Sequence, residues 1–198
     1  EPLRRHLMLA PKWGNGDHRV DGLATEITDM LYSEFRHRTN PRGGRWQLAL
    51  YSFVANLSLG KAVGASADSR RAKTLLTRNL NPSWGTDRNG PTATLRSLSH
   101  IDFTKFPNGS TLDLRFDPNP LKTAEGRAKF VGFLKGFMEL GVMTMQLSMV
   151  DEETLRDAQQ HPENHPHLMV KVAGYSARFI DLAAEEQEEL IRRTTQQL

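Results

Sequence analysis

Apolar and polar positions along the chain follow a helical period in some stretches and a strand-like period in others. In residues 21–36 apolar side chains recur at every fourth position, which predicts an amphipathic helix with one stripe toward a core. The stripe consists of Leu23, Ile27, Leu31 and Phe35. We expect Asp21 to cap this helix, because its carboxylate can accept a hydrogen bond from a free N–H group of the first turn. Residues 40–44 (NPRGG) then end it.

The helical period is clearest in residues 123–140. Gly141 follows directly and suits a C-terminal cap, since glycine readily adopts the left-handed conformation that such caps require. The side chains expected on the buried side of this helix are Phe130, Val131, Leu134, Phe137 and Met138. Other helices are expected at residues 151–160, capped by Asp151, at 183–196, with mostly solvent-facing charges, and briefly at 72–76 and 95–101.

Strands are predicted where apolar and polar residues alternate. Residues 111–116 (TLDLRF) indicate a half-buried strand. Residues 143–149 place methionine and leucine on one face and Thr144, Gln146 and Ser148 on the other, and this polar face could line the interior of a barrel. Residues 47–59 predict a strand followed by a loop, and 168–172 predict one more strand. Helices and strands alternate, so the fold class is α/β.

One long segment lacks any sustained period. Residues 60–93 are rich in Gly, Asn, Asp, Ser and Pro. A stretch of this length without regular structure is unusual inside a compact domain and is often functional.

The segment that indicates a chemical function most directly is residues 171–179 (KVAGYSARF). A Gly-Tyr pair after a short apolar strand is often only a turn. This nonapeptide also resembles the R-V-x-G-Y-x-A signature that carries the radical glycine of glycyl radical enzymes. There one glycine loses an α-hydrogen and stores an unpaired electron, which requires a flat α-carbon without a side chain. The matching residue is Gly174.

Two upstream segments resemble the same family. Residues 64–71 (GASADSRR) are similar to its G-A-[ST]-P-D-G-R segment, and residues 81–93 (NPSWGTDRNGPTA) to its S-P-x-x-G-x-D-x-x-G-P-T-A segment. Spacing and order both fit, and the resemblance extends from about Pro11 onward. Further matching residues are Gln146, Leu155, Ala158, Gln159, Pro162, Glu163, Gln187, Arg192, Arg193 and Thr194.

This resemblance implies a fold and a site. The chain would be the C-terminal part of a ten-stranded α/β barrel of the pyruvate formate-lyase type, with residues 1–76 ending the barrel domain and 77–198 forming the glycine radical domain. Gly174 would be the catalytic residue. The rest of the radical loop would comprise Lys171, Val172, Ala173, Tyr175, Ser176 and Ala177. The side chains expected to bury Gly174 in the complete barrel are Met169, Val170, Tyr175 and Phe179.

The chain departs from the family pattern at three positions. Lys171 replaces the arginine of the signature and lacks the planar fork of a guanidinium. Ala67 and Ser69 replace proline and glycine, so the turn near residue 68 is expected to differ. These departures leave the subfamily open. The A-G-Y-S-A form resembles the dehydratase, lyase and decarboxylase branches more than the formate acetyltransferase form.

The absence of cysteine changes the picture. It excludes disulfides and thiolate metal sites. Glycyl radical enzymes pass the radical to a cysteine, whose thiyl radical attacks a small-molecule substrate. The simplest interpretation is that this chain is the C-terminal part of a longer enzyme, or one piece of a split one, with the cysteine loop N-terminal to it.

The resemblance also implies the partners of this chain. Activation would come from a separate enzyme that uses S-adenosylmethionine and an iron–sulfur cluster, and this chain would itself bind no cofactor. Whether the protein forms a homodimer stays open. An alternative interpretation is a radical-carrying accessory or repair subunit, which docks on a damaged enzyme and needs no cysteine of its own.

Charge and motif content favour no other function. The formal charge of +3 invites nucleic-acid binding, but 26 basic residues are scattered among 23 acidic ones, which is typical of a solvated surface. Histidines at 161, 165 and 167 suggest a metal, although two prolines keep them off a regular face, and we expect none. No apolar run approaches the ~20 residues that span a bilayer, and no signal peptide is evident, so we expect a cytoplasmic protein of an anaerobic cell.

Overall fold

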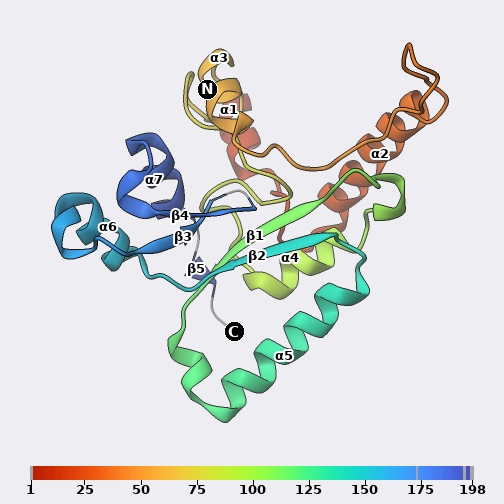
Figure 1. Ribbon diagram of the computed structural model, residues 1–198. Coiled ribbons are helices and arrows are strands. Elements are labelled where there is room, and N and C mark those ends of the chain that lie inside the picture. Colours follow the sequence, from red (N-terminus) through yellow and green to blue (C-terminus); the bar gives the residue numbers. More distant parts are fainter. Residues whose placement is uncertain (1, 173, 194, 197–198) are drawn as a thin grey trace.

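The computed structural model describes residues 2–172, 174–193 and 195–196. Figure 1 shows a small sheet with α4 and α5 below it and the C-terminal elements gathered at one end. The helices are α1 (Pro2–Leu9), α2 (His18–Phe35), α3 (Ala55–Ala62), α4 (Gly90–Leu98), α5 (Ala124–Glu139), α6 (Glu152–Gln160) and α7 (Ala184–Ile191). The strands are β1 (Thr111–Phe116), β2 (Thr144–Ser148), β3 (Met169–Lys171), β4 (Ser176–Arg178) and β5 (Thr195–Gln196). Short 3₁₀ turns are η1 (Phe103–Lys105), η2 (Asn119–Lys122), η3 (Pro162–Asn164) and η4 (Phe179–Asp181).

Within the described residues, β2, β1 and β5 form a parallel sheet in that order. Alternate residues of β1 point to its two faces. Leu112, Leu114 and Phe116 lie in the larger hydrophobic core, against α4 and α5. Asp113 and Arg115 are buried as well, so the prediction that this strand is half-buried was wrong. Their face is covered by residues far away in the sequence, which contribute charged partners.

Helix α5 matches its prediction in extent and in its ends. The hydroxyl of Thr123 accepts a hydrogen bond from the Gly126 N–H at 3.0 Å, and Gly141 has a φ of +71°. The buried side differs in part: Phe137 is buried and Phe130 and Leu134 are half-buried, as expected.

Val131 and Met138, however, are 48% and 78% exposed, and Phe133 is buried instead. The reason is where the Phe116 ring of β1 meets the helix. The ring of Phe116 packs edge-on against Phe130 and Phe133, at centroid distances of 5.5 and 5.3 Å, and thereby selects the side of α5 that turns inward.

Helix α2 begins one turn earlier than predicted. Its N-cap is Asp17, not Asp21, and the Asp17 side chain accepts a hydrogen bond from the Arg19 N–H at 3.0 Å. The Arg19 side chain also donates to this carboxylate, from Nε at 3.0 Å and from Nη2 at 2.7 Å, and thereby lowers the pKa of Asp17 to about 2. Asp21 lies inside the first turn and is fully buried.

The apolar stripe of α2 is not covered by this chain. Leu23, Ile27 and Leu31 are 55%, 46% and 37% exposed, which contradicts the expected core-facing position. In Figure 1, α2 extends away from the sheet. The helical period was correct, but among the four stripe residues only Phe35 is half-buried, with its ring 6.4 Å from that of Trp46.

Three further predictions need correction. Residues 47–54 form no strand beyond a single bridge between Leu50 and Ser110, and α3 follows. The long segment at 60–93 is irregular as expected, without the brief helix at 72–76, and α4 begins at its end, at Gly90, where Pro91 suits a first helical turn. The last helix stops at Ile191, because residues 195–196 pair with β1 as β5.

A second hydrophobic core holds the C-terminal elements together. It lies between α6, β3, η4 and α7, and its most buried members are Leu155, Ala158, Val170, Val172, Phe179, Leu190 and Ile191. The predicted cap of α6 is confirmed: the Asp151 carboxylate accepts a hydrogen bond from the Thr154 N–H at 2.7 Å. This core anchors the hairpin described next.

Candidate functional site

The segment that resembles the radical signature is the tip of a β-hairpin. Strands β3 and β4 are antiparallel, with Lys171 opposite Ser176, and the Val172 N–H donates to the Tyr175 carbonyl at 3.0 Å. The described residue at the hairpin tip, between these two strands, is Gly174. Ala173, which we predicted as part of the loop, lies outside the described residues.

Gly174 has the backbone conformation that favours glycine. Its φ is +90°, in a region that L-residues rarely adopt. The space beside it is open: a Cβ built at this position would find only the Gln146 Nε2 atom, at 4.0 Å. Glycine is required here by the backbone and not by crowding.

Gly174 faces the polar side of β2. An open cavity of about 310 Å³ lies beside it and is lined by Asn79, Thr111, Thr144 and Gln146 among other uncharged residues. The Gln146 Oε1 atom is buried there without a hydrogen-bond partner among the described residues. The polar face predicted for residues 143–149 thus lines a hollow beside Gly174, whereas Met145 and Leu147 pack toward the core.

The cover expected around Gly174 is only partly present in this chain. Val170 and Phe179 are buried in the second core, whereas Met169 is 51% and Tyr175 42% exposed. The Tyr175 ring lies 6.4 Å from the ring of Phe53. Gly174 itself is exposed, so its burial in a complete barrel stays a prediction.

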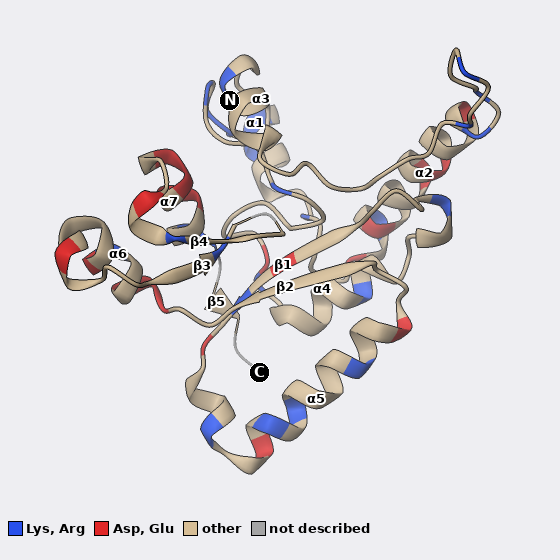
Figure 2. Cartoon of the chain, in the orientation of Figure 1, with Lys and Arg blue, Asp and Glu red and all other residues tan. Residues whose placement is uncertain are grey.

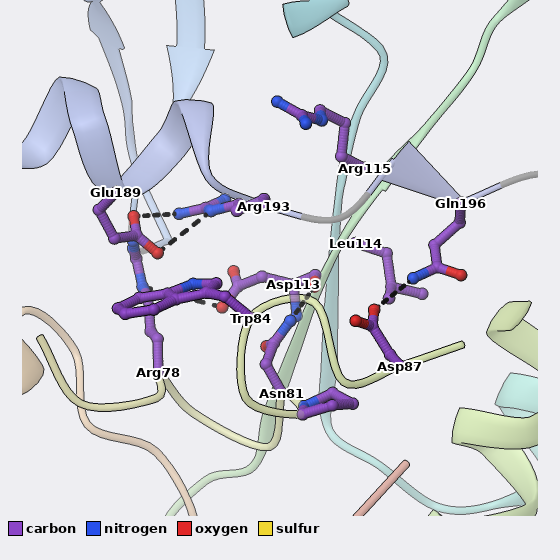
Figure 3. A pocket seen from close by; sticks show the side chains of 11 residues that line it. Arg78, Asn81, Trp84, Asp87, Asp113, Leu114, Arg115, Glu189, Arg193 and Gln196 are labelled. Carbon is purple, nitrogen blue, oxygen red and sulfur yellow. Dashed lines mark hydrogen bonds and ion pairs between the residues drawn. The ribbon is translucent and has the colours of Figure 1, made fainter. Parts of the chain in front are cut away.

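A buried ionic network contacts the hairpin at the carbonyl of Val172. Figure 3 shows its side chains. Arg78 donates through Nη1 to Glu189 at 2.8 Å and through Nη2 to the carbonyl of Val172. Arg193 binds Glu189 at 3.0 Å and the same Val172 carbonyl at 3.4 Å. We call Arg78, Glu189 and Arg193 the carbonyl clasp.

Asp113 of β1 completes the charge balance. Its carboxylate lies 3.8 Å from Arg78 Nε and accepts a hydrogen bond from the Asn79 amide at 2.5 Å. Burial raises the pKa of Asp113 and lowers the pKa of Arg78, since both lose hydration. Two guanidinium and two carboxylate groups thus compensate one another away from solvent.

A cavity of about 20 Å³ lies within this network, lined by Arg78, Trp84, Asp113 and Arg193 among others (Figure 3). Arg78 Nε and Asp113 Oδ1 make no hydrogen bond to the described residues. The cavity has room for one water molecule, which is the usual partner of such buried atoms.

The histidine-rich segment forms a separate cluster on the surface. Asp157 binds His161 Nδ1 at 3.0 Å and His165 Nε2 at 2.6 Å. Both hydrogen bonds lower the pKa of Asp157, and the bond to His165 has the larger effect. Among the described residues, no group of three or more histidine, aspartate and glutamate side chains is arranged to hold a metal ion.

In Figure 2, basic and acidic segments are interspersed along the chain, and acidic residues gather on α6 and α7. Among the described residues, no helix is both long and apolar enough to cross a membrane.

Sequence reasoning found the first strand and the loop of the hairpin but missed β4 and most of the clasp. Lys171 and Ser176 lie on the paired strands and Ala177 is half-buried opposite Val170, as a compact loop requires. Arg193 was noted only as a family match, and Arg78 and Glu189 were not identified. The hydrogen bond from Arg78 to Val172 spans 94 positions of sequence, and no local pattern indicates such a contact.

The sequence of this chain matches two known protein families. Residues 76–180, more than half of the chain, match the family model described as "Glycine radical", and residues 1–60 match the model described as "Pyruvate formate lyase-like".

Individual relatives agree. The chain is 36% identical over 193 residues to the indoleacetate decarboxylase of Tractidigestivibacter scatoligenes, covering 97% of this chain and 22% of that protein. It is 34% identical to the isethionate sulfite-lyase of Nitratidesulfovibrio vulgaris (98% and 24% covered). The glycerol-bound B12-independent glycerol dehydratase of Clostridium butyricum superimposes with a TM-score of 0.93 at 34% identity, covering 100% and 25%. The chain thus spans about a quarter of these relatives, and the predicted α/β fold of the pyruvate formate-lyase type is confirmed.

Proposed function

Because this chain belongs to the glycyl radical enzyme family, we propose that it stores an unpaired electron on Gly174 and supplies it for radical cleavage of a bond in a small molecule. The observation that supports this proposal is the geometry of Gly174. Its α-carbon carries no side chain, sits at φ +90° on a hairpin tip and opens onto the polar hollow beside β2.

The proposed chemistry needs two hydrogen-atom transfers. In activation, the Cα–H bond of Gly174 breaks homolytically, and the hydrogen atom goes to a radical that a separate activating enzyme generates from S-adenosylmethionine. In turnover, the Gly174 radical takes a hydrogen atom from a cysteine thiol outside this chain, which leaves a thiyl radical and an intact glycine. This chain has no thiolate for an iron–sulfur cluster of its own.

The reaction class we propose is C–C or carbon–heteroatom cleavage. It rests on the relatives, which include a decarboxylase, a sulfite-lyase and a dehydratase. The relatives also include a pyruvate formate-lyase-like enzyme of Escherichia coli, so an acetyltransferase-like reaction stays within the proposal. We propose residues 1–76 as the end of the barrel domain and 77–198 as the radical domain.

An accessory or repair subunit is the alternative function, and the missing cysteine is the observation that favours it. The match of residues 1–60 to the barrel model supports an enzyme part instead, because a replacement radical domain needs no barrel segment. Activity of the chain with the cysteine-bearing part, and its loss when residues 1–60 are removed, would support the enzyme part.

The substitution Gly174→Ala tests the site. We expect it to abolish the electron paramagnetic resonance doublet after activation, because the substitution puts a Cβ on the α-carbon that would carry the radical. The fold should persist, since a Cβ has space, at a cost of about 1 kcal/mol for the left-handed backbone.

Gly43→Ala is the matched control. Gly43 has a φ of +80° and nothing within 4 Å of a Cβ, so this variant imposes the same backbone strain elsewhere and should keep the signal. A doublet that persists in Gly174→Ala would show that the radical lies on another residue.

A further inference from the structure

We propose that Arg78 and Arg193 are positioning residues that orient Gly174 by holding the carbonyl of Val172. This inference rests on the proposed function for its chemical meaning, but its geometry stands on the described contacts alone. Both guanidinium groups converge on one backbone oxygen, two residues before Gly174.

The side chain, the N–H group and the carbonyl of Val172 are each held by a contact. Its side chain is 1% exposed in the second core, its N–H donates to the Tyr175 carbonyl, and its carbonyl accepts from both arginines. A peptide group is planar, so holding the oxygen of Val172 fixes the plane that leads into the turn. Only one residue separates that plane from Gly174. The clasp therefore limits the directions in which the α-carbon of Gly174 can face.

The clasp members come from two separate parts of the chain. Arg78 lies in the irregular segment before α4, Glu189 lies in α7, and Arg193 follows that helix. The three side chains are 4%, 3% and 7% exposed. Glu189 keeps the two cations together, so neither guanidinium can leave the Val172 carbonyl without separating a buried ion pair.

If Arg78 and Arg193 only stabilised the fold, they would not need to donate to the same carbonyl. Arg115 shows that alternative nearby: it donates to the carbonyls of Leu190 and Ile191 at the end of α7, away from the hairpin tip. Arg78 and Arg193 instead both donate hydrogen bonds to the carbonyl of Val172, just before the turn. This difference is what assigns them to positioning Gly174.

The first measurement is hydrogen exchange in the unactivated protein, which needs no radical. Arg78→Met removes the donors, and we expect peptides covering residues 168–179 to exchange about tenfold faster or more, because hydrogen bonds to a charged group restrain local opening. Peptides from α5 should not change. Arg78→Lys keeps the charge but cannot serve Glu189 and Val172 together, so it should show the same acceleration if Arg78→Met does not fold.

Arg127→Met is the matched control. Arg127 also donates to backbone carbonyls, those of Leu121 and Lys122, but on α5 and far from the hairpin in the sequence. We expect hairpin exchange in this variant to equal the wild type. Unchanged hairpin exchange in a folded Arg78→Met variant would overturn the inference.

The second measurement is the resonance signal after activation. In Arg78→Met we expect the radical yield per chain to fall about tenfold or more, or the doublet splitting to change, because small misplacements of a reacting atom carry large rate penalties. Arg127→Met should match the wild type. A wild-type yield and line shape in folded Arg78→Met would contradict positioning. If the wild type itself gives no signal, the proposed function fails and hydrogen exchange alone decides the clasp.

Discussion

Gly174 and Ser69 show how a side chain changes the backbone strain at a position with positive φ. Gly174 occupies φ +90° without strain, whereas Ser69 occupies φ +84° with a Cβ. Ser69 stands where the resembling family segment has glycine, and its hydroxyl oxygen is buried without a partner among the described residues. The turn is nevertheless kept, since the Ser69 N–H donates to Ser66 and the Ser66 N–H donates to Arg70. The predicted difference at this turn is therefore one of strain and not of hydrogen bonding.

Replacing Ser69 with glycine should stabilise the protein. We expect Ser69→Gly to raise the free energy of unfolding by about 1 kcal/mol, because relief of the positive φ exceeds the added freedom of the unfolded chain. Denaturant unfolding checks this. Ser66→Gly is the control and should be destabilising, since the Ser66 hydroxyl donates to Asp68 at 2.6 Å. A lower midpoint for Ser69→Gly would contradict this account.

At the residue scale the sequence singled out Gly174 as the candidate radical site, but it did not indicate the groups that hold the hairpin. A radical glycine has a local signature, and its neighbours along the chain carry that information. Arg78 and Asp113 become partners only after folding brings distant segments together. A buried charge also runs against the usual rule that such side chains are exposed, so their role could not be predicted from composition.

Elements with strong local signals were predicted best. The apolar period and Gly141 gave α5, the Asp151 cap gave α6, and alternation gave β2. Strand β5 was missed because its two residues are strand only through pairing with β1. The period of α2 could not tell its exposed stripe from a buried one, since covering a stripe is a property of other elements.

The cap of α6 makes a prediction at this scale. Asp151→Ala should lower the free energy of unfolding by about 1 kcal/mol, because the Thr154 N–H loses its acceptor. Asp151→Asn keeps an acceptor and should lie closer to the wild type at neutral pH. Thermal unfolding of both variants beside the wild type measures the cap, and an unchanged Asp151→Ala would refute it.

The same cap predicts a pH dependence. The Thr154 N–H lowers the pKa of Asp151 below its ordinary value of 3.8. A carboxylate with a depressed pKa contributes stability above its unfolded-state pKa and loses it as the pH falls through the folded-state pKa. The advantage of wild type over Asp151→Asn should therefore shrink below about pH 4. A gap that widens in acid would contradict this sign.

At the scale of the whole molecule, the open side of α2 and the open hollow beside Gly174 belong together. Both are surfaces that a further part of a barrel would cover, and the chain spans about a quarter of its relatives. The sequence predicted the fold class because the family signature spans the chain. It could not predict which apolar faces stay uncovered, because the burial of a face depends on which other elements pack against it after folding.

The proposed radical also predicts a chemical fate in air. A carbon radical at Gly174 adds dioxygen, and the resulting peroxyl species breaks the backbone there. We expect activated protein to split into two pieces near Gly174 on aeration, and unactivated protein or Gly174→Ala to stay whole. Mass spectrometry before and after aeration checks this; an intact chain after verified activation would count against the radical assignment.

The parallel pairing of β5 with β1 decides what happens to the severed tail. After scission, residues 175–198 would no longer be joined covalently to the rest of the chain. Their non-covalent contacts would remain: Leu190 and Ile191 pack in the second core, and β5 pairs with β1. Arg115 would still donate hydrogen bonds to the carbonyls at the end of α7. The damaged protein should therefore elute as one species from a native sizing column and separate only under denaturing conditions. Oxygen would leave a nicked particle of normal size and shape, which a non-denaturing purification would not distinguish from the intact protein.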